Sequence, residues 1–137
     1  MRLSSLAAVL TLLALPAAHA ADCSRADTQM ELDACAAAAF KADDATLNQL
    51  YARIEARLGG DADKRKALVA AQRAWVAYRD AACKFAASGV EGGSIHPMIV
   101  TDCEDRLTKR RIQDFQAYLS CQEGDTACPV PQARADG

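Results

Sequence analysis

The sequence predicts an all-α fold, namely an antiparallel bundle of three long helices stapled by disulfides. Apolar residues recur at three- and four-residue steps in three separate segments, which is the spacing of one face of an α-helix. The strict alternation of apolar and polar residues that marks a half-buried strand does not stand out anywhere. The chain has 137 residues and six cysteines, so we expect one domain and three disulfides.

Residues 1–20 are predicted to be a signal peptide that is cleaved on export. A positive start at Arg2 precedes an apolar run and the small-x-small cleavage site Ala-His-Ala. The apolar run is too short to span a bilayer as a mature helix. Asp22 stands directly before Cys23, where a lipid-attachment box requires a small residue. We therefore expect a periplasmic or secreted protein with no membrane anchor.

The predicted helical domain covers residues 21–122, and its first helix begins with a capping box. Thr28 and Glu31 have the spacing at which each side chain bonds the backbone N–H of the other. Gly59 and Gly60 are expected to end this helix. Its apolar face comprises Phe40, Asp43, Leu47, Leu50, Tyr51, Ile54 and Leu58.

Cap residues, glycine and proline mark the remaining boundaries. Asp61 or Asp63 can cap the second helix. A break rich in Gly and Ser follows at residues 88–94, and Pro97 suits the first turn of the third helix. The tail, residues 123–137, is predicted to be irregular. The second face comprises Leu68, Gln72, Trp75, Arg79, Ala82 and Cys83, and the third comprises Ile99, Cys103, Leu107, Arg111, Phe115 and Leu119.

An ideal antiparallel register brings one acidic residue opposite a basic one. The first hairpin folds about residues 60–61, which places Asp43 opposite Arg79, with Arg111 about one turn away. A buried Asp is costly without a partner, and a guanidinium removes most of that cost. We interpret the pair as a structural contact that fixes the register. The alternative is a binding or catalytic carboxylate.

The second hairpin indicates which cysteines pair. It folds near Gly93 and places Cys83 opposite Cys103, which makes this the best-supported disulfide. Nearest-neighbour pairing completes the set with Cys23–Cys35 and Cys121–Cys128. Six cysteines allow 15 pairings, and Cys35 is expected at the same end as Cys83 and Cys103, so other pairings stay open.

Three segments resemble the LprI-like family of exported proteins. They are Thr28-Gln29-x-Glu31-x-x-x-Cys35 with Ala42-Asp43-x-x-x-Leu47-Asn48-x-x-Tyr51, then Leu68-x-x-x-Gln72-Arg73-Ala74-Trp75-x-x-Tyr78-Arg79-Asp80-Ala81-x-Cys83, and finally Gly92-Gly93-Ser94 with Cys103-x-x-x-Leu107-Thr108-x-x-Arg111. The resemblance covers about residues 23–119, and its central segment is the most specific. Leu32 stands where the family usually has Met, which conserves volume. Cys121 and Cys128 lie outside the shared pattern.

This resemblance implies a small, helical, disulfide-bonded envelope protein. The family is named for a member that inhibits lysozyme. That founding member is a lipoprotein, and because this chain lacks the lipid box, membrane anchoring does not carry over. We interpret the motif residues Asp43, Asn48, Tyr51, Gln72, Trp75, Arg79, Asp80 and Arg111 as chiefly structural. Trp75 and Tyr51 would fill the core, Arg79 would neutralise Asp43, and Asn48 and Gln72 would bond each other or a turn.

The connection at residues 88–96 is the candidate binding loop, tethered at its base by the expected Cys83–Cys103 bridge. Ser94 and His96 can donate hydrogen bonds into the acidic cleft of a glycan hydrolase, which is built around two carboxylates. Glu91 would attract a basic lysozyme. The alternative is an ordinary connection between two helices.

Composition and motifs exclude several function classes. A net charge of −2 and a pI near 5.6 argue against nucleic acid as a partner. The sequence has no phosphate-binding loop, nucleophile motif or His/Cys metal cluster, so we expect no enzyme, no cofactor and no metal. The expected partner is a lysozyme or another peptidoglycan hydrolase. The alternative is a periplasmic immunity or envelope-interaction protein that binds another cell-wall-targeting toxin or partner through Arg73, Lys109 and Arg110.

Overall fold

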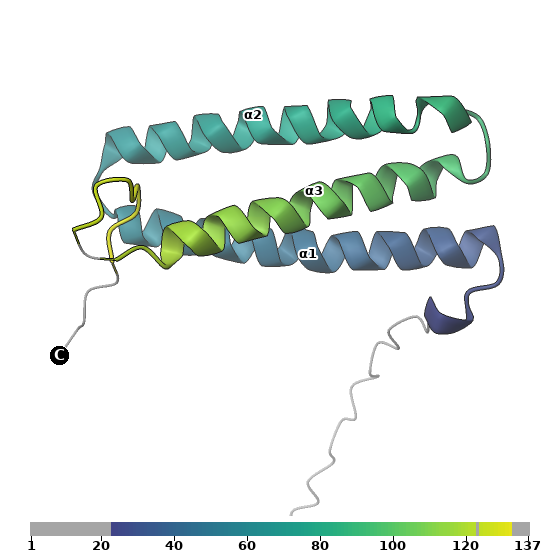
Figure 1. Cartoon of the computed structure of the whole chain (residues 1–137), viewed down its shortest axis with the longest axis horizontal. Helices are drawn as coiled ribbons and strands as arrows, with labels where there is room; N and C mark the ends of the chain where they lie inside the picture. Colours follow the sequence, from purple (N-terminus) through teal and green to yellow (C-terminus); the bar gives the residue numbers. More distant parts are fainter. Residues whose placement is uncertain (1–22, 123, 133–137) are drawn as a thin grey trace, which may run out of the picture.

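The computed structural model describes residues 23–122 and 124–132, so the expected signal peptide lies outside the described residues. Three long helices dominate this part of the chain (Figure 1): α1 (Gln29–Leu58), α2 (Ala62–Ala86) and α3 (His96–Leu119). Two short 3-10 helices, η1 (Cys23–Arg25) and η2 (Ser88–Val90), precede α1 and follow α2. No strand occurs among these residues. The predicted all-α class is therefore confirmed.

The sequence signals for the helix ends act as expected. Thr28 donates its backbone N–H to the Glu31 carboxylate at 2.9 Å, and Glu31 N–H donates to Thr28 Oγ1 at 3.3 Å. Gly59 ends α1 with φ +54°, a conformation that favours glycine. Asp61, rather than Asp63, caps α2, because its Oδ1 accepts from the Lys64 N–H at 3.0 Å.

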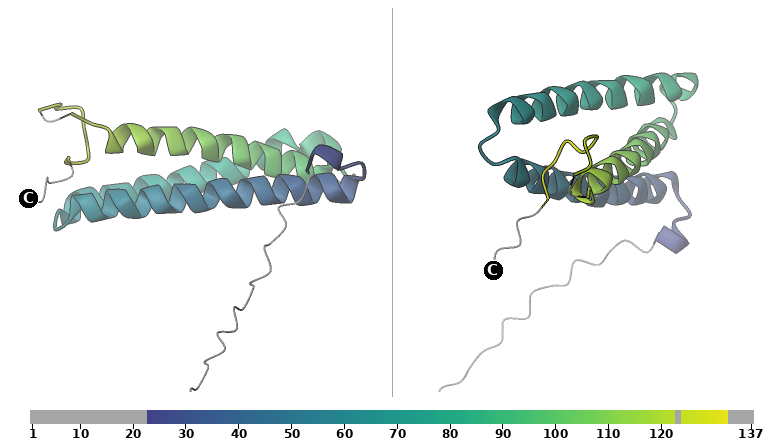
Figure 2. Two further views of the ribbon diagram at one scale, coloured as in Figure 1. Left: turned by 90° about the horizontal axis from the view of Figure 1, so that it is seen from below. Right: turned by 60° about the vertical axis from the view of Figure 1, so that its left-hand side comes forward.

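The three helices do not pack symmetrically. α3 contacts both other helices, and its contact with α1 is the most extensive, whereas α1 and α2 barely touch. Figures 1 and 2 show α2 standing apart from α1 along most of its length. The main core therefore lies between α1 and α3. It consists of Leu47, Leu50, Ile54, Leu58, Ile112, Phe115 and Val130.

Three disulfides fix the ends of this bundle. The structure pairs Cys23 with Cys35, Cys83 with Cys103, and Cys121 with Cys128. This is the nearest-neighbour scheme expected from the sequence. The middle bridge holds the end of α2 against the start of α3, and the last one closes the tail into a short loop.

The tail after α3 has no helix or strand in its described part, yet it packs against the bundle. Val130 is only 3% exposed and belongs to the main core. Gln132 Nε2 donates to the Cys121 carbonyl at 3.1 Å, which holds the tail in place. None of the helices in the described residues is both long enough and apolar enough to span a membrane.

Candidate functional site

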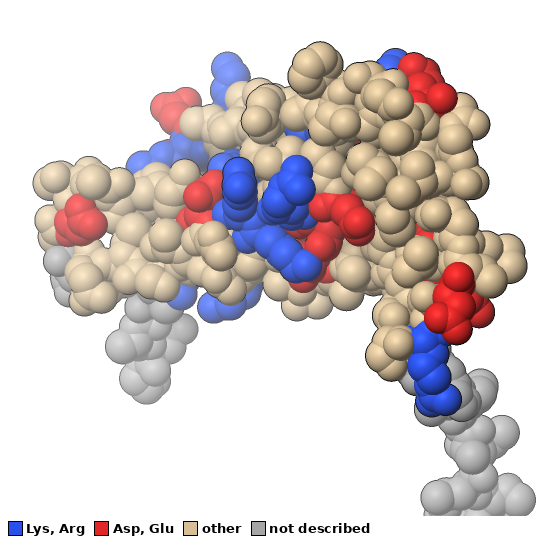
Figure 3. All heavy atoms as spheres, turned by 45° about the vertical axis from the view of Figure 1, so that its right-hand side comes forward, with Lys and Arg blue, Asp and Glu red and all other residues tan. Residues whose placement is uncertain are grey.

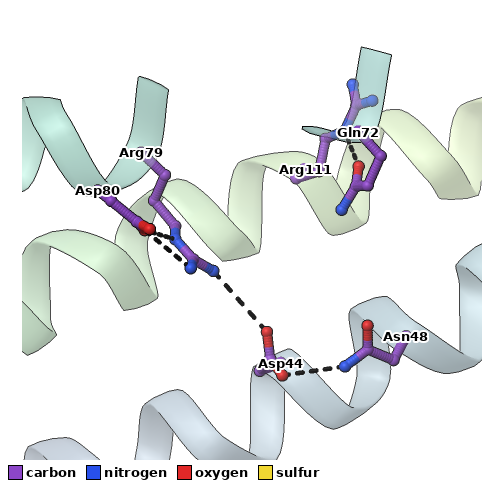
Figure 4. A network of polar contacts seen from close by, with 6 residues as sticks. All are labelled: Asp44, Asn48, Gln72, Arg79, Asp80 and Arg111. Carbon is purple, nitrogen blue, oxygen red and sulfur yellow. Dashed lines mark hydrogen bonds and ion pairs between the residues drawn. The ribbon is translucent and has the colours of Figure 1, made fainter. Parts of the chain in front are cut away.

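Polar side chains from all three helices form a polar network of two separate groups (Figure 4), one around Arg79 and the other between Gln72 and Arg111. On α2, Arg79 bonds Asp80 Oδ1 at 2.9 Å and reaches Asp44 on α1 at 3.8 Å. Asp44 also accepts from Asn48 Nδ2 at 2.9 Å. These contacts link α2 to α1 at a point where the two helices otherwise lie apart.

The expected pairing of Asp43 with Arg79 is wrong, because Arg79 bonds the neighbouring residue Asp44. Asn48 and Gln72 do not bond each other either: Asn48 donates to Asp44, and Gln72 accepts from Arg111 Nε at 3.2 Å. Successive residues on a helix point about 100° apart. Because α1 packs on α3 rather than directly on α2, α1 is rotated about its axis compared with an ideal two-helix hairpin. Asp44 therefore lies toward Arg79, and Asp43 lies toward α3.

Two arginines of the motif stack between aromatic rings. The Arg79 guanidinium lies 5.3 Å from the Phe40 ring and 5.2 Å from the Trp75 ring. Arg111 lies 5.9 Å from Trp75 and 4.6 Å from Phe115. Both arginine side chains are only 11% exposed. The stack runs across all three helices, so it joins α2 to the α1–α3 core.

Asp43 lies on the other side of α1, where it faces α3. Lys109 Nζ approaches its carboxylate at 3.4 Å and also bonds Asp105. Burial and the neighbouring Asp105 carboxyl raise the pKa of Asp43 above its usual value, although Lys109 opposes this. The bond to Asp105 also raises the pKa of Lys109.

Sequence reasoning gave no role to two polar residues that α3 buries. Asp105 and Thr108 are buried, and Asp105 Oδ1 and Thr108 Oγ1 have no hydrogen-bond partner in the structure. Both lie off the predicted apolar face of the third helix, because α3 packs against α1 on one side and against α2 on another. Their spacing of three residues, one helical turn, was the signal available in the sequence.

The charged side chains visible in Figure 3 are intermixed. Lys and Arg gather near the middle of this face, and Asp and Glu lie beside them. Lys109 is part of such a mixed group through Asp43 and Asp105. The surface around Lys109 and Arg110 therefore carries carboxylates as well as cations.

The candidate loop forms one end of the bundle. Tight turns connect η2 to α3, with Gly93 N–H donating to the Val90 carbonyl at 3.0 Å and His96 N–H to the Gly93 carbonyl at 3.1 Å. Glu91 and His96 line a pocket of about 590 Å³, whereas Ser94 is exposed outside it. The other lining residues are Ala81, Lys84, Phe85, Ser88 and Val100.

Large apolar side chains are exposed at this same end. Figure 1 shows that the start of α1, the end of α2 and the start of α3 lie together there. Among the described residues six large hydrophobic side chains are exposed, and all but Tyr78 belong to this end. We call these five the apolar end: Met30, Leu32, Phe85, Val90 and Ile95. Phe85 is 81% exposed, and its position off the predicted apolar face of the second helix was the sequence signal for it.

The part of the chain that the structure describes has no group of three or more His, Cys, Asp or Glu side chains able to hold a metal ion. The polar network joins helices, while the apolar end offers an exposed aromatic ring beside groups that can donate hydrogen bonds. The apolar end is therefore suited to contact with another macromolecule.

Comparison with known proteins adds a family. The family model described as "Lysozyme inhibitor LprI" matches residues 20–115. An uncharacterized protein of Rhizobium meliloti is 36% identical over 113 residues, which cover 74% of this chain and 81% of that protein. No solved structure matches the chain.

Proposed function

Since this chain belongs to the LprI family of lysozyme inhibitors, we propose that it is an exported, non-enzymatic protein that binds a lysozyme and blocks its cleft. It would act in the periplasm or outside the cell, and it would protect the cell wall from glycan cleavage. The apolar end is the proposed binding surface.

The observation that carries this proposal is the gathering of exposed apolar side chains at one end. Exposed apolar side chains that gather at one end of a small protein are typical of an interaction site. Aromatic side chains at such a site often supply most of the binding energy. Phe85 and Met30 are 81% and 79% exposed, so both are available to a partner.

Two disulfides make this end rigid before a partner arrives. Cys83–Cys103 joins the end of α2 to α3, two residues before Phe85, and Cys23–Cys35 joins η1 to the first turns of α1. A surface held in its bound shape loses less conformational entropy on binding. This rigidity supports a tight inhibitor rather than a loop that orders only in the complex.

The polar groups around Phe85 suit the chemistry of a glycan hydrolase. Its cleft contains two catalytic carboxylates, which accept hydrogen bonds and attract cations. Lys84, Ser88 and His96 surround the pocket beside Phe85 and can act as donors. Glu91 at the rim would favour approach to a basic enzyme surface. Ser94 would contribute through its exposed hydroxyl.

A lysis assay with one matched pair of variants tests the proposal. The oxidised mature protein is titrated against c-type, g-type and i-type lysozymes acting on cell walls. We expect inhibition of at least one type, weakened roughly 30-fold or more by Phe85→Ala, the loss typical of a hot-spot residue. Tyr78→Ala is the control, because Tyr78 is another exposed aromatic residue on α2, 61% exposed, outside the apolar end.

The proposed site is wrong if both variants inhibit like the unmodified protein, or if both lose inhibition equally. Absence of inhibition for every lysozyme type contradicts the proposed activity itself. A periplasmic immunity or envelope-interaction role would then be the better account. It would use the basic residues Arg73, Lys109 and Arg110, whose surface also carries the carboxylates of Asp43 and Asp105.

A further inference from the structure

A second pocket lies at the opposite end of the bundle, where the tail meets the helices. It has a volume of about 260 Å³. Figures 1 and 2 show the tail lying beside the ends of the helices here, far from the apolar end. The lining residues are Ile54, Leu58, Lys64, Ala67, Leu68, Ala71, Arg111, Tyr118, Pro129 and Val130.

The asymmetric packing of the bundle explains this pocket. α1 and α2 have few contacts with each other, and residues of both helices on either side of the Gly59 turn line this pocket. The tail covers part of it, because Val130 is inserted into the core and Cys121–Cys128 holds the tail loop closed. The pocket is thus formed by four separate segments of the chain.

Most of the pocket wall is apolar. Ile54 and Leu58 come from α1, Leu68 from α2 and Val130 from the tail. An apolar protein cavity of about 150 Å³ is large enough to bind benzene. The larger volume here therefore accommodates a longer apolar group, and burial of that group away from water would drive binding.

The charged lining residues are both cationic. Lys64 Nζ lies 3.6 Å from Asp61, and Arg111 Nη1 lies 3.5 Å from Asp114, but neither carboxylate lines the pocket. Both carboxylate side chains are more exposed than 40%, at 42% and 56%. Lys64 and Asp61 are both about half exposed, and exposed pairs contribute little, so a ligand carboxylate could compete for Lys64. Arg111 is largely buried and keeps its contacts with Gln72 and Asp114, so it would add only the attraction of its positive charge.

We propose that this pocket binds a single-chain amphiphile with an anionic head group, namely a medium-chain fatty acid. Its alkyl chain lies against the apolar wall of α1, α2 and the tail. Its carboxylate bonds Lys64 at the mouth and is attracted by Arg111. This site is separate from the proposed lysozyme-binding surface and does not depend on it.

Calorimetric titration of the full oxidised protein with decanoate tests this site. Ala71→Phe places a ring in the pocket from an exposed position on the helix, so we expect the fold to survive and decanoate binding to be lost. Lys64→Gln should weaken binding roughly tenfold, which is the effect of one charge-assisted hydrogen bond. Lys66→Gln, a change at an exposed lysine outside the pocket lining, should bind decanoate like the unmodified protein.

Three further ligands separate the contributions to binding. Acetate, which lacks the chain, should not bind, and decanol, which lacks the charge, should bind about as weakly to the unmodified protein as to Lys64→Gln. Vesicles of phosphatidylglycerol test a membrane surface as the source of the amphiphile. The proposal is overturned if decanoate does not bind, if Ala71→Phe binds it unchanged, or if only the vesicles bind. Phe85→Ala should leave decanoate affinity unaltered, which keeps this result independent of lysozyme inhibition.

Discussion

The stacking of Arg79 is the contact whose removal should most weaken the attachment of α2. Arg79→Ala removes two ring contacts, to Phe40 at 5.3 Å and to Trp75 at 5.2 Å. It also removes the bond to Asp80 at 2.9 Å and the longer contact with Asp44 at 3.8 Å. The arginine side chain is 11% exposed, so water cannot replace these contacts fully.

The expected loss follows from the separate contacts. Each cation–π contact is worth about 0.5–2 kcal/mol, depending on its exposure. The Asp80 and Asp44 carboxylates are exposed, so their pairs together add about 1 kcal/mol at most. The two ring contacts and the two pairs together amount to about 1–5 kcal/mol, so we expect Arg79→Ala to lower the free energy of unfolding by about 3 kcal/mol. For a domain of this size, this corresponds to a fall in Tm of roughly 10 °C.

Urea denaturation of the oxidised protein, followed by circular dichroism, measures this loss. Arg79→Lys is the decisive control, because it keeps the charge but not the planar group that stacks on both rings. It should recover less than half of the lost stability. Full recovery would refute the stacking argument and leave charge as the cause.

A double-mutant cycle tests the revised register in the same assay. Asp43 faces Lys109 and Asp105 on α3 instead of Arg79. Arg79→Ala and Asp43→Asn should therefore have additive effects, within about 0.5 kcal/mol. A larger coupling would restore the ideal hairpin register and contradict the structure.

Three other predictions concern the cap, the carboxyl pair and a disulfide. Thr28→Ala should cost about 1 kcal/mol in urea denaturation, since it removes the N-cap of α1. Hydrogen bonds from Thr28 lower the pKa of Glu31. The stability that the capping box adds should therefore be present above the ordinary Glu pKa and be lost as the pH falls through the lowered pKa. A destabilisation by Thr28→Ala that stays constant from pH 7 to pH 2 would contradict this. Burial raises the pKa of Asp43, so the folded state favours the protonated carboxyl. The stability that this protonation adds is fully present below the ordinary Asp pKa and is lost as the pH rises through the raised pKa. The stability of the protein relative to Asp43→Asn should accordingly fall as the pH rises from below the ordinary Asp pKa to above the raised one. Unfolding curves at the two ends of that range would show an unchanged difference if the carboxyl were not perturbed. Replacing Cys83 and Cys103 together by Ser opens a loop of sequence separation 20 and should cost about 3 kcal/mol, which a thermal melt with no shift would disprove.

Local signals were sufficient to predict most of the fold. The Thr28–Glu31 capping box, the Gly59 stop and Pro97 in the first turn of α3 all lie where the sequence places them. These features depend on residues within one helical turn of each other, so no knowledge of packing is needed. The hairpin near Gly93 similarly brings Cys83 to Cys103, because a short connection leaves two long helices little freedom there.

The candidate site could be predicted only in part. Glu91 and His96 line a pocket, as a binding loop requires, but the exposure of Phe85 beside them was not foreseen. A single apolar residue outside the predicted apolar face of a helix is common. Only the structure shows that Phe85 lies at the same end as the exposed side chains of Val90 and Ile95. The second pocket was beyond prediction, because it combines three helices with a tail expected to be irregular.

The sequence by itself determined the helices, their caps, a plausible disulfide scheme and a family resemblance, since each rests on spacing along the chain. The tertiary structure alone decided that Arg79 bonds Asp44, that Asp43 faces Lys109, and that a pocket lies beneath the tail. The physical reason is that α3 packs far more closely on α1 than α2 does. That preference sets the rotation of α1 and the separation of α2, and both depend on side-chain packing among three helices at once.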